Sequence, residues 1–450
     1  ALACLASFKA YCDRQLFVSD DAVLKARFEV DLERPELASI AGAFQVSDIG
    51  VRGVQVRRCK GRFRAGEHTV RLDNATAYIG MDHVVNGELT LNLQTREIRG
   101  RASGTLEPSL LFRALDQPMP AWLAATQFAV PPFFDVELEP SPSARPADWH
   151  GRCTVKADHV LYGANHLRHL SATVTRKPGR VDIEGLAAAW TDGQQQLSGA
   201  LAFDEQTRRL SGGLAGAIYP TVILRSLPEL PVAWRQAVES VHFTGPPAKI
   251  ALTLDGCGLA VEQWHGTLAI DASSIRWRDW PLDLASCTVV CRPGRVNIEN
   301  LAIAASDQLQ RLAGAIGYDE QSRRLSGRLE GTVAPAAVLR NLPELPPAWQ
   351  DALAAVRFTG PPARFDLSLD ECGLAFEEWN GTLAVELYDV GCRGLALDRV
   401  SCPLRLENGV LHSVPALEVR DDDGGLRGAT CEVTLDTRTR RLAASGALEV

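Results

Sequence analysis

Two stretches of the chain, LSGALAFDEQTRRLSGGLAG at residues 197–216 and LAGAIGYDEQSRRLSGRLEG at residues 312–331, are nearly identical. In the second stretch Leu312, Gly314, Ile316 and Tyr318 alternate with the residues between them, and a polar turn, YDEQSRR at 318–324, follows. Alternation with a period of two is typical of antiparallel strands with one buried face. Each stretch therefore predicts a β-hairpin, and the 115-residue offset (312 − 197) predicts a repeat protein.

The same offset recurs along the chain. WHG at Trp149 returns as WHG at Trp264 and as WNG at Trp379, and LPELPVAW ending at Trp234 returns as LPELPPAW ending at Trp349. We expect each of the three WHG or WNG motifs to begin a unit on a strand. The more divergent outer copies then predict a truncated repeat, three whole repeats and a second truncated repeat, with boundaries at 1–39, 40–148, 149–263, 264–378 and 379–450.

One repeat is predicted to hold five or six strands and a short helical segment. In ARFDLSL at 363–369 apolar and polar residues alternate, as they do in GRVNIENL at 294–301, and RPGR at 292–295 marks a turn. The segment 334–358 has Trp349, Ala352, Leu353 and Val356 at helical spacing, and the prolines of PELPP are expected to divide it into two short helices.

Bulk properties exclude several classes of protein. The net charge of −8 gives no reason to expect nucleic-acid binding, and no stretch of about 20 apolar residues predicts a membrane span. The 11 cysteines include no CxxC motif, and they are interpreted as small buried apolar residues; Cys287 and Cys291 are expected on one face of a strand. Because the chain starts with Ala and lacks a signal peptide, we expect it to be an excerpt of a longer protein.

The physical consequence of this pattern is a sheet with one apolar face that must be covered. Either the repeats close into packed sandwiches, or the sheet forms a trough whose apolar floor meets a ligand. Many apolar-face residues are small, as in LSGALAF and LAGAIGY, which favours the trough. The predicted fold is therefore all-β: an elongated, twisted, open antiparallel β-sheet groove built from repeats of about 115 residues, each with a short helical segment.

The hairpin pattern from Gly199 to Gly212, together with FTGPPA after the helical segment, resembles the AsmA-like proteins of the bacterial envelope. These belong to the repeating β-groove group of bridge-like lipid transfer proteins. The resemblance implies that the apolar face carries the acyl chains of lipids, generally phospholipids, between membranes. It also implies a periplasmic location, an inner-membrane anchor formed by a segment outside this chain, and envelope proteins as partners at the ends.

On this reading the lipid groove is lined by the apolar residues of successive strands. The predicted lining residues are Phe28, Val30, Leu32, Leu89, Leu91, Leu93, Phe134, Val136, Leu138, Val181, Ile183, Leu197, Leu201, Phe203, Ile250, Leu252, Leu254, Leu268, Ile270, Val296, Ile298, Leu312, Ile316, Tyr318, Phe365, Leu367, Leu369, Leu383 and Val385. Their partner would be a phospholipid or another acyl-chain lipid, held by non-directional burial of the hydrocarbon.

Sites for chemistry are not predicted. No GxSxG motif, P-loop or dinucleotide fingerprint occurs, so we expect no enzyme, no catalytic residues, no cofactor and no metal. His166 and His169 are interpreted as surface residues, FDEQTRR at 203–209 as a structural turn, and RDDDGGL at 420–426 as a hairpin turn despite its resemblance to a calcium loop. The alternative to lipid transport is a non-enzymatic structural or adhesive scaffold made of closed β-repeats.

Overall fold

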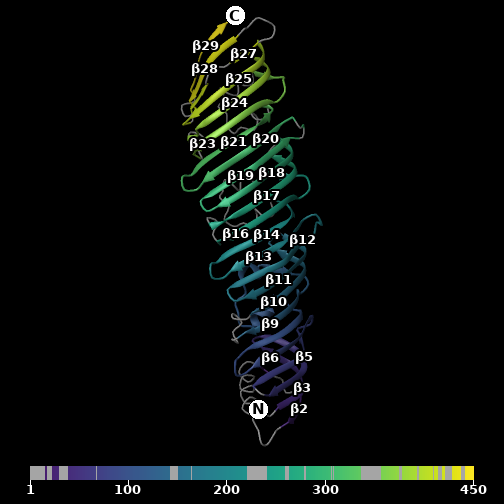
Figure 1. The fold of residues 1–450 in the computed structure, drawn as a ribbon. Coiled ribbons are helices and arrows are strands. Elements are labelled where there is room, and N and C mark those ends of the chain that lie inside the picture. The colour runs from purple at the N-terminus through teal and green to yellow at the C-terminus, as the bar shows by residue number, and fades with distance from the viewer. Residues whose placement is uncertain are drawn as a thin grey trace. The chain divides into compact units, whose positions relative to one another are not determined.

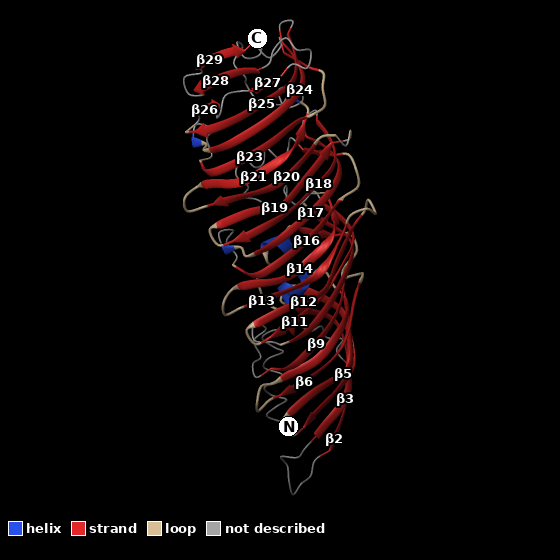
Figure 2. Cartoon of the chain, turned by 45° about the horizontal axis from the view of Figure 1, so that its top comes forward, coloured by secondary structure: helices blue, strands red, loops and turns tan. Residues whose placement is uncertain are grey.

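The computed structural model confirms an all-β chain in which the strands pair in an open antiparallel sheet. Figure 2 shows that strands dominate and that helices are short. The chain divides into two units, Ala1–Leu214 and Ala215–Val450, each of which is described by itself. The structure describes residues 16–17, 23–29, 39–66, 68–141, 150–163, 165–219, 241–258, 263–277, 280–305, 307, 309–335, 356–373, 378–392, 395–408, 410–413, 418–420, 428–436 and 441–449.

The first unit consists of antiparallel strands that follow one another in chain order (Figure 1). It contains β1 (Leu16–Phe17), β2 (Val23–Glu29), β3 (Ser39–Val51), β4 (Val54–Gly66), β5 (Thr69–Ile79), β6 (His83–Asn92), β7 (Ile98–Thr105), β8 (Thr126–Phe128), β9 (Phe133–Ser141), β10 (Gly151–Tyr162), β11 (Asn165–Lys177), β12 (Arg180–Trp190) and β13 (Gln196–Asp204). Two short helices, α2 (Pro108–Ala114) and α3 (Ala121–Ala124), separate β7 from β8. The strand β14 (Arg209–Ile218) contains the boundary between the units.

The second unit repeats the same order of strands. It contains β15 (Val241–Phe243), β16 (Ala248–Cys257), β17 (Gly266–Trp277), β18 (Trp280–Arg292), β19 (Arg295–Ala305), β20 (Arg311–Asp319), β21 (Arg324–Val333), β22 (Val356–Phe358), β23 (Ala363–Cys372), β24 (Gly381–Cys392), β25 (Leu395–Glu407), β26 (Val410–Ser413), β27 (Glu418–Arg420), β28 (Gly428–Asp436) and β29 (Arg441–Glu449). The expected turn RPGR lies between β18 and β19, which confirms that element of the sequence prediction.

Strand positions follow the 115-residue period closely. The strands β10, β17 and β24 begin at Gly151, Gly266 and Gly381, and β11, β18 and β25 begin at residues 165, 280 and 395. The helical segment of the first whole repeat consists of two short helices, and Pro108 begins α2, where a missing N–H costs nothing. The segment predicted at 334–358 lies mostly outside the described residues.

The expectation that the WHG and WNG motifs begin on strands is wrong for the copies that the structure describes. Trp264 and Trp379 precede β17 and β24 by two residues. The reason is a local turn: the Cys257 thiol donates to the carbonyl oxygen of His265 at 2.8 Å and accepts its N–H at 3.2 Å. Cys372 makes the same contacts with Asn380, at 2.9 and 3.3 Å. Trp149 lies outside the described residues.

The best-buried part of the second unit lies near the short strand β15. Ala248, Ala272, Ile275 and Leu282 form a buried cluster, and partly buried residues packed against it include Val241, Phe243, Ile270, Ala285 and Ile303. In the first unit, Ala157 and Val160 occupy the positions of Ala272 and Ile275, 115 residues earlier, and are 2% and 1% exposed. This buried place therefore recurs with the repeat, and a second one lies at Cys257 and Cys372, which are 2% and 0% exposed.

Candidate functional site

The candidate site is one face of the sheet, and repeated β-bulges determine which residues lie on it. In β19 the register passes from Ile298 opposite Ile316 to Leu301 opposite Gly314, so two residues face one. Asn300 has a φ of 52° at this bulge, Gly185 has a φ of 58° at the same place in β12, and Asn74 has a φ of 51° in β5. Since a bulge shifts the alternation by one residue, Ile298, Leu301 and Ile303 all lie on one face.

In the first unit this face carries continuous rows of apolar residues, because directly opposed residues in antiparallel strands share a face. One row runs from β4 to β10, and a second runs from β3 to β13. The first consists of Phe63, Leu72, Leu89, Gly100, Leu138 and Gly151. The second consists of Phe44, Gly61, Ala75, Gly87, Ala102, Val136, Cys153, Val174, Ile183 and Leu201, with Gly61 lying beside Ala75 at a register shift between β4 and β5. We call the face that bears these rows the apolar face.

The second unit has an apolar face built in the same way. A row from β16 to β20 consists of Leu252, Leu268, Val289, Ile298 and Ile316. Another, from β19 to β25, consists of Leu301, Gly314, Leu329, Leu367, Leu383 and Leu404. The remaining predicted residues of this unit lie in further opposed pairs of the same face: Ile250 with Ile270, Leu254 with Gly266, Val296 with Tyr318, Ile303 with Leu312, Phe365 with Val385, and Leu369 with Gly381.

The other predicted lining residues of the first unit have these places. Leu91 lies between Val70 and Ile98, and Leu93 follows the end of β6. Opposed pairs are formed by Phe134 with Val155, Val181 with Phe203, and Leu197 with Ala188. Phe28 is opposite Ile40 in the backbone register, and Val30 and Leu32 lie outside the described residues.

The predicted lining side chains are mostly half-buried. Among those that the structure describes, Ile250 and Leu369 are buried, whereas Leu89 is 36% and Leu93 is 41% exposed. The rest have intermediate exposure, including Val136, Ile298 and Leu367. In a closed sandwich the facing side chains interdigitate and lose contact with water. The described parts of the apolar face therefore keep hydrocarbon surface in contact with solvent.

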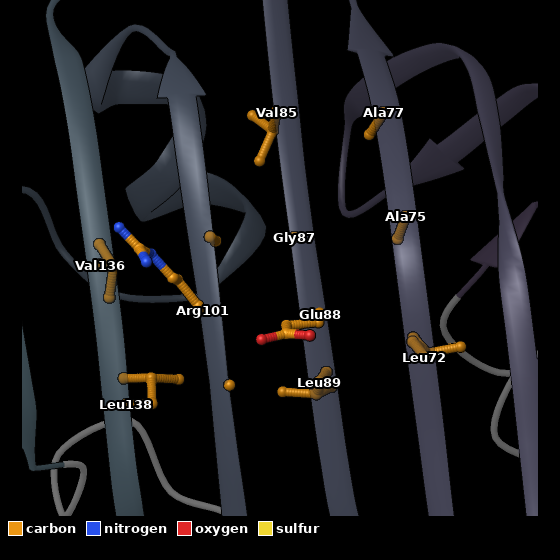
Figure 3. A pocket seen from close by; sticks show the side chains of 12 residues that line it. Leu72, Ala75, Ala77, Val85, Gly87, Glu88, Leu89, Arg101, Val136 and Leu138 are labelled. Carbon is orange, nitrogen blue, oxygen red and sulfur yellow. The ribbon is translucent and has the colours of Figure 1, made fainter.

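A hollow lies in the apolar face of the first unit, where β5, β6, β7 and β9 lie side by side (Figure 3). Its cavity volume is about 210 Å³. Small residues form its floor, and larger apolar side chains border it: Ala75, Ala77, Gly87, Gly100 and Ala102 on the floor, with Leu72, Val85, Leu89, Val136 and Leu138 around them. Such a hollow can bind an apolar molecule through non-directional hydrophobic contact.

Some glycines on the apolar face are required by the sheet itself. Gly314 has a φ of 152°, and a Cβ atom there would collide with the carbonyl oxygen of Arg328 on the neighbouring strand. Gly87 would bring a Cβ to 2.8 Å from the carbonyl oxygen of Arg101. The small floor residues thus permit close approach of strands and at the same time keep the face open.

The opposite face, which we call the polar face, carries a repeated ion pair. Arg101 on β7 donates to Asp135 on β9 through Nε at 3.1 Å and Nη2 at 2.7 Å. Arg328 on β21 donates in the same manner to Asp366 on β23, at 3.0 and 2.5 Å. The guanidinium hydrogen bonds hold the pKa of both carboxyl groups below its usual value, although partial desolvation opposes them.

The repeated turn at 203–209, with its copy at 318–324, is closed by hydrogen bonds to an aspartate of its own. Asp204 accepts a hydrogen bond from the backbone N–H of Thr207 at 2.7 Å, and Asp319 accepts one from Ser322 at 2.8 Å. These backbone hydrogen bonds lower the pKa of both carboxyl groups. The interpretation as a turn is confirmed for both copies, whereas most of RDDDGGL lies outside the described residues.

The candidate metal ligands do not converge in the described part of the chain. His166 and His169 lie on β11, and His169 Nδ1 is 2.7 Å from Asp158 Oδ1 on β10. Within the described ranges, no group of three His, Cys, Asp or Glu residues is arranged to hold a metal ion. Cys287 and Cys291 share the apolar face through their partners Ile270 and Gly266, and burial raises the pKa of both thiols.

No family model, curated protein or solved structure matches the chain. In the portions that the structure describes, no helix has the length and hydrophobicity needed to cross a bilayer.

Sequence reasoning missed the residues of this site that follow a bulge. Leu301 and Ile303 belong to the apolar face only because of the bulge at Asn300. The sequence held a signal for this bulge: Gly185 in one copy is replaced by Asn300 in the next, and both residue types favour positive φ.

Proposed function

We propose that this protein binds acyl-chain lipids, phospholipids in particular, on the apolar face of its sheet and moves them between membranes of the bacterial envelope. The observation that carries the proposal is the apolar face: opposed rows of apolar side chains that stay half-exposed from strand to strand. The resemblance to AsmA-like proteins of the repeating β-groove group supports the same function, as does a repeat that lengthens one surface without adding a unique site.

Physical chemistry supports a hydrocarbon guest. Each buried methylene contributes about 0.8 kcal/mol, so an acyl chain of about 16 carbons needs no polar pocket to be held. Contact of this kind is non-directional, so a chain can slide from one row to the next without breaking hydrogen bonds. The hollow at Ala75 and Gly87 gives such a chain a place where the floor is lowest.

A direct test places a photo-crosslinking residue on either face of one strand. We expect p-benzoylphenylalanine at Leu367 to crosslink to co-purified lipid, as it should at Leu89, and the same residue at Ser368 to give no lipid adduct, because Leu367 and Ser368 point to opposite faces of β23. Mass spectrometry of the adducts identifies the lipid class. Equal labelling at both positions, or none at either, would contradict lipid binding on this face and favour the scaffold.

Transport is tested separately from binding. Native mass spectrometry of the intact chain should show bound phospholipid, and transfer of a fluorescent phospholipid between vesicles should require the same face. A chain that binds lipid but never accelerates transfer would refute the transport part of the proposal while leaving the binding part in place.

A further inference from the structure

The polar face of the first unit gathers cations from distant parts of the sequence onto one surface. The residues Arg58, Lys60, Arg62 and Arg64 alternate along β4, and all four are exposed. Lys25 and Arg27 on β2 lie in the same rows as Arg62 and Arg64, through Ala43 and Ala41 on β3. Arg71 on β5 and Arg99 on β7 continue the row of Arg64. We call these eight residues the cationic patch.

The patch stands out against the charge of the whole chain. The strands β2 to β5 hold Lys25, Arg27, Arg57, Arg58, Lys60, Arg62, Arg64 and Arg71 against the carboxylates Glu29, Asp48 and Asp73, a local excess of 8 − 3 = 5 positive charges in a chain of net charge −8. Of the carboxylates, Asp73 is paired with Arg71, its Oδ1 lying 2.5 Å from Nε. Among the described residues, Lys60, Arg62 and Arg64 have no ion-pair partner.

Comparison with the other repeats shows that the scaffold does not need these cations. Strands β4, β11, β18 and β25 each have 13 residues and the same place in the repeat. The position of Lys60 is serine in all three other copies: Ser171, Ser286 and Ser401. The positions of Arg62 and Arg64 are Thr173 and Thr175 in β11, Thr288 and Val290 in β18, and Pro403 and Arg405 in β25, which also has Arg399 at the position of Arg58. Lys60 and Arg62 thus depart from all three other copies, and this departure points to a surface with its own partner.

The dimensions and composition of the patch favour a planar partner. From β2 to β7 there are five strand spacings, roughly 24 Å, and Arg58 to Arg64 spans roughly 20 Å along β4. The surface between the cations is a sheet face with alanines and threonines, without the row of aromatic side chains on which single-stranded nucleic acids stack. At its margin, Tyr78 is 36% exposed opposite Arg58, and Met81 in the next turn is 84% exposed.

We infer that the cationic patch is a docking surface for the headgroups of an anionic lipid bilayer. The lysine and arginine side chains meet headgroup phosphates, and Tyr78 and Met81 contact the interfacial region at the edge of the patch. The rest of the chain has a net charge of −13 (−8 − 5), which the negative surface repels, so we expect the cationic patch to face the bilayer and to orient the first unit. The inference concerns the face opposite the apolar one and does not depend on lipid transport.

The test measures binding of the full chain to vesicles by co-sedimentation. Vesicles of phosphatidylcholine with roughly 30% phosphatidylglycerol are compared with vesicles of phosphatidylcholine alone, at low salt and at about 0.5 M NaCl. We expect binding to the anionic vesicles only, and its loss at high salt. The variant K60S/R62T/R64T carries the residues of β11 at these positions and should bind about a hundredfold more weakly, since each cation near the surface contributes roughly a factor of five.

Two further variants make the result decisive. The control K249S/R276T/R292T removes three exposed cations from the second unit and should bind as the unchanged chain does. The transplant S171K/T173R/T175R builds the same three cations on β11 and should strengthen binding to anionic vesicles. Equal binding to both vesicle types, or an unchanged K60S/R62T/R64T variant, overturns the inference. The same variants are also tested with a single-stranded oligonucleotide. If the unchanged chain binds the oligonucleotide, and K60S/R62T/R64T loses this binding but still binds anionic vesicles, the patch is assigned to nucleic acid instead.

Discussion

A charge placed on the apolar face should have opposite consequences at two positions of the second unit. Leu367 is half-buried between Leu329 and Leu383, whereas Ile275 is 6% exposed and packed with Ala272 and Leu282. In Leu367→Asp the carboxylate keeps contact with water, and the loss of half a buried leucine costs on the order of 1 kcal/mol. In Ile275→Asp the lost burial costs about 2–3 kcal/mol, and an unpaired charge in the core adds several kcal/mol more.

The assay measures both local unfolding and the amount of bound phospholipid. Hydrogen exchange of β17 and β23, measured on the full chain, reports local unfolding, and native mass spectrometry reports bound phospholipid. We expect Leu367→Asp to keep protected strands and lose lipid, and Ile275→Asp to lose protection around β17. Ser368→Asp, one residue along and on the polar face, should change neither. If Leu367→Asp unfolds β23 as completely as Ile275→Asp unfolds β17, the apolar face is a closed core and the reasoning fails.

Three further predictions follow from individual features. Ala102→Phe fills the hollow of the first unit and should reduce lipid crosslinking at position 89 while thermal unfolding stays within a few degrees; undiminished crosslinking would show that the hollow holds no lipid. Gly314→Ala forces a Cβ against the Arg328 carbonyl and should destabilise the second unit by about 1–3 kcal/mol, whereas Gly185→Asn, which copies Asn300, should be tolerated; equal denaturation midpoints for the two variants would contradict this. Hydrogen bonds from Gln310 lower the pKa of Asp307 below its unfolded value despite partial desolvation, so this carboxylate stabilises the fold above the unfolded pKa, near 4, and the contribution is lost as the pH falls through the lowered pKa; Asp307→Asn should therefore lower the melting temperature at pH 7 and have little effect near pH 2, and an equal effect at both pH values would exclude the linkage.

Much of the fold could be predicted from the sequence because the repeat offers each element several times. The offset of 115 residues placed the strands, and alternation placed residues such as Val296 and Ile298 on one face. Turns could be predicted because an aspartate at the start of a turn, such as Asp319, accepts hydrogen bonds from backbone N–H groups of the turn. Alternation alone is the same in a closed sandwich and in an open sheet, so the prediction of an open sheet depended on the small residues of LSGALAF and LAGAIGY.

The parts of the site that were missed depend on the register between strands. Leu301 lies three residues after Ile298, so simple alternation assigns it to the polar face, and only the bulge at Asn300 returns it to the apolar one. The cationic patch depends on long-range pairing in the same way. Lys25 and Arg62 are 37 residues apart in sequence (62 − 25), and they share a surface because both are opposite Ala43.

Because of the bulges at Asn74, Gly185 and Asn300, the number of residues in a strand decides which face its side chains occupy. Each one resets the phase of its strand, so every side chain after it depends on one extra backbone position. Deleting Asn300 would remove the bulge and restore regular pairing, so Leu301 and Ile303 would stay on the apolar face, whereas deleting Ala302, beyond the bulge, would turn Ile303 to the polar face. A one-residue deletion inside a strand but away from its bulge should therefore be more damaging than most substitutions, whereas duplication of a whole repeat preserves the phase and leaves both faces intact.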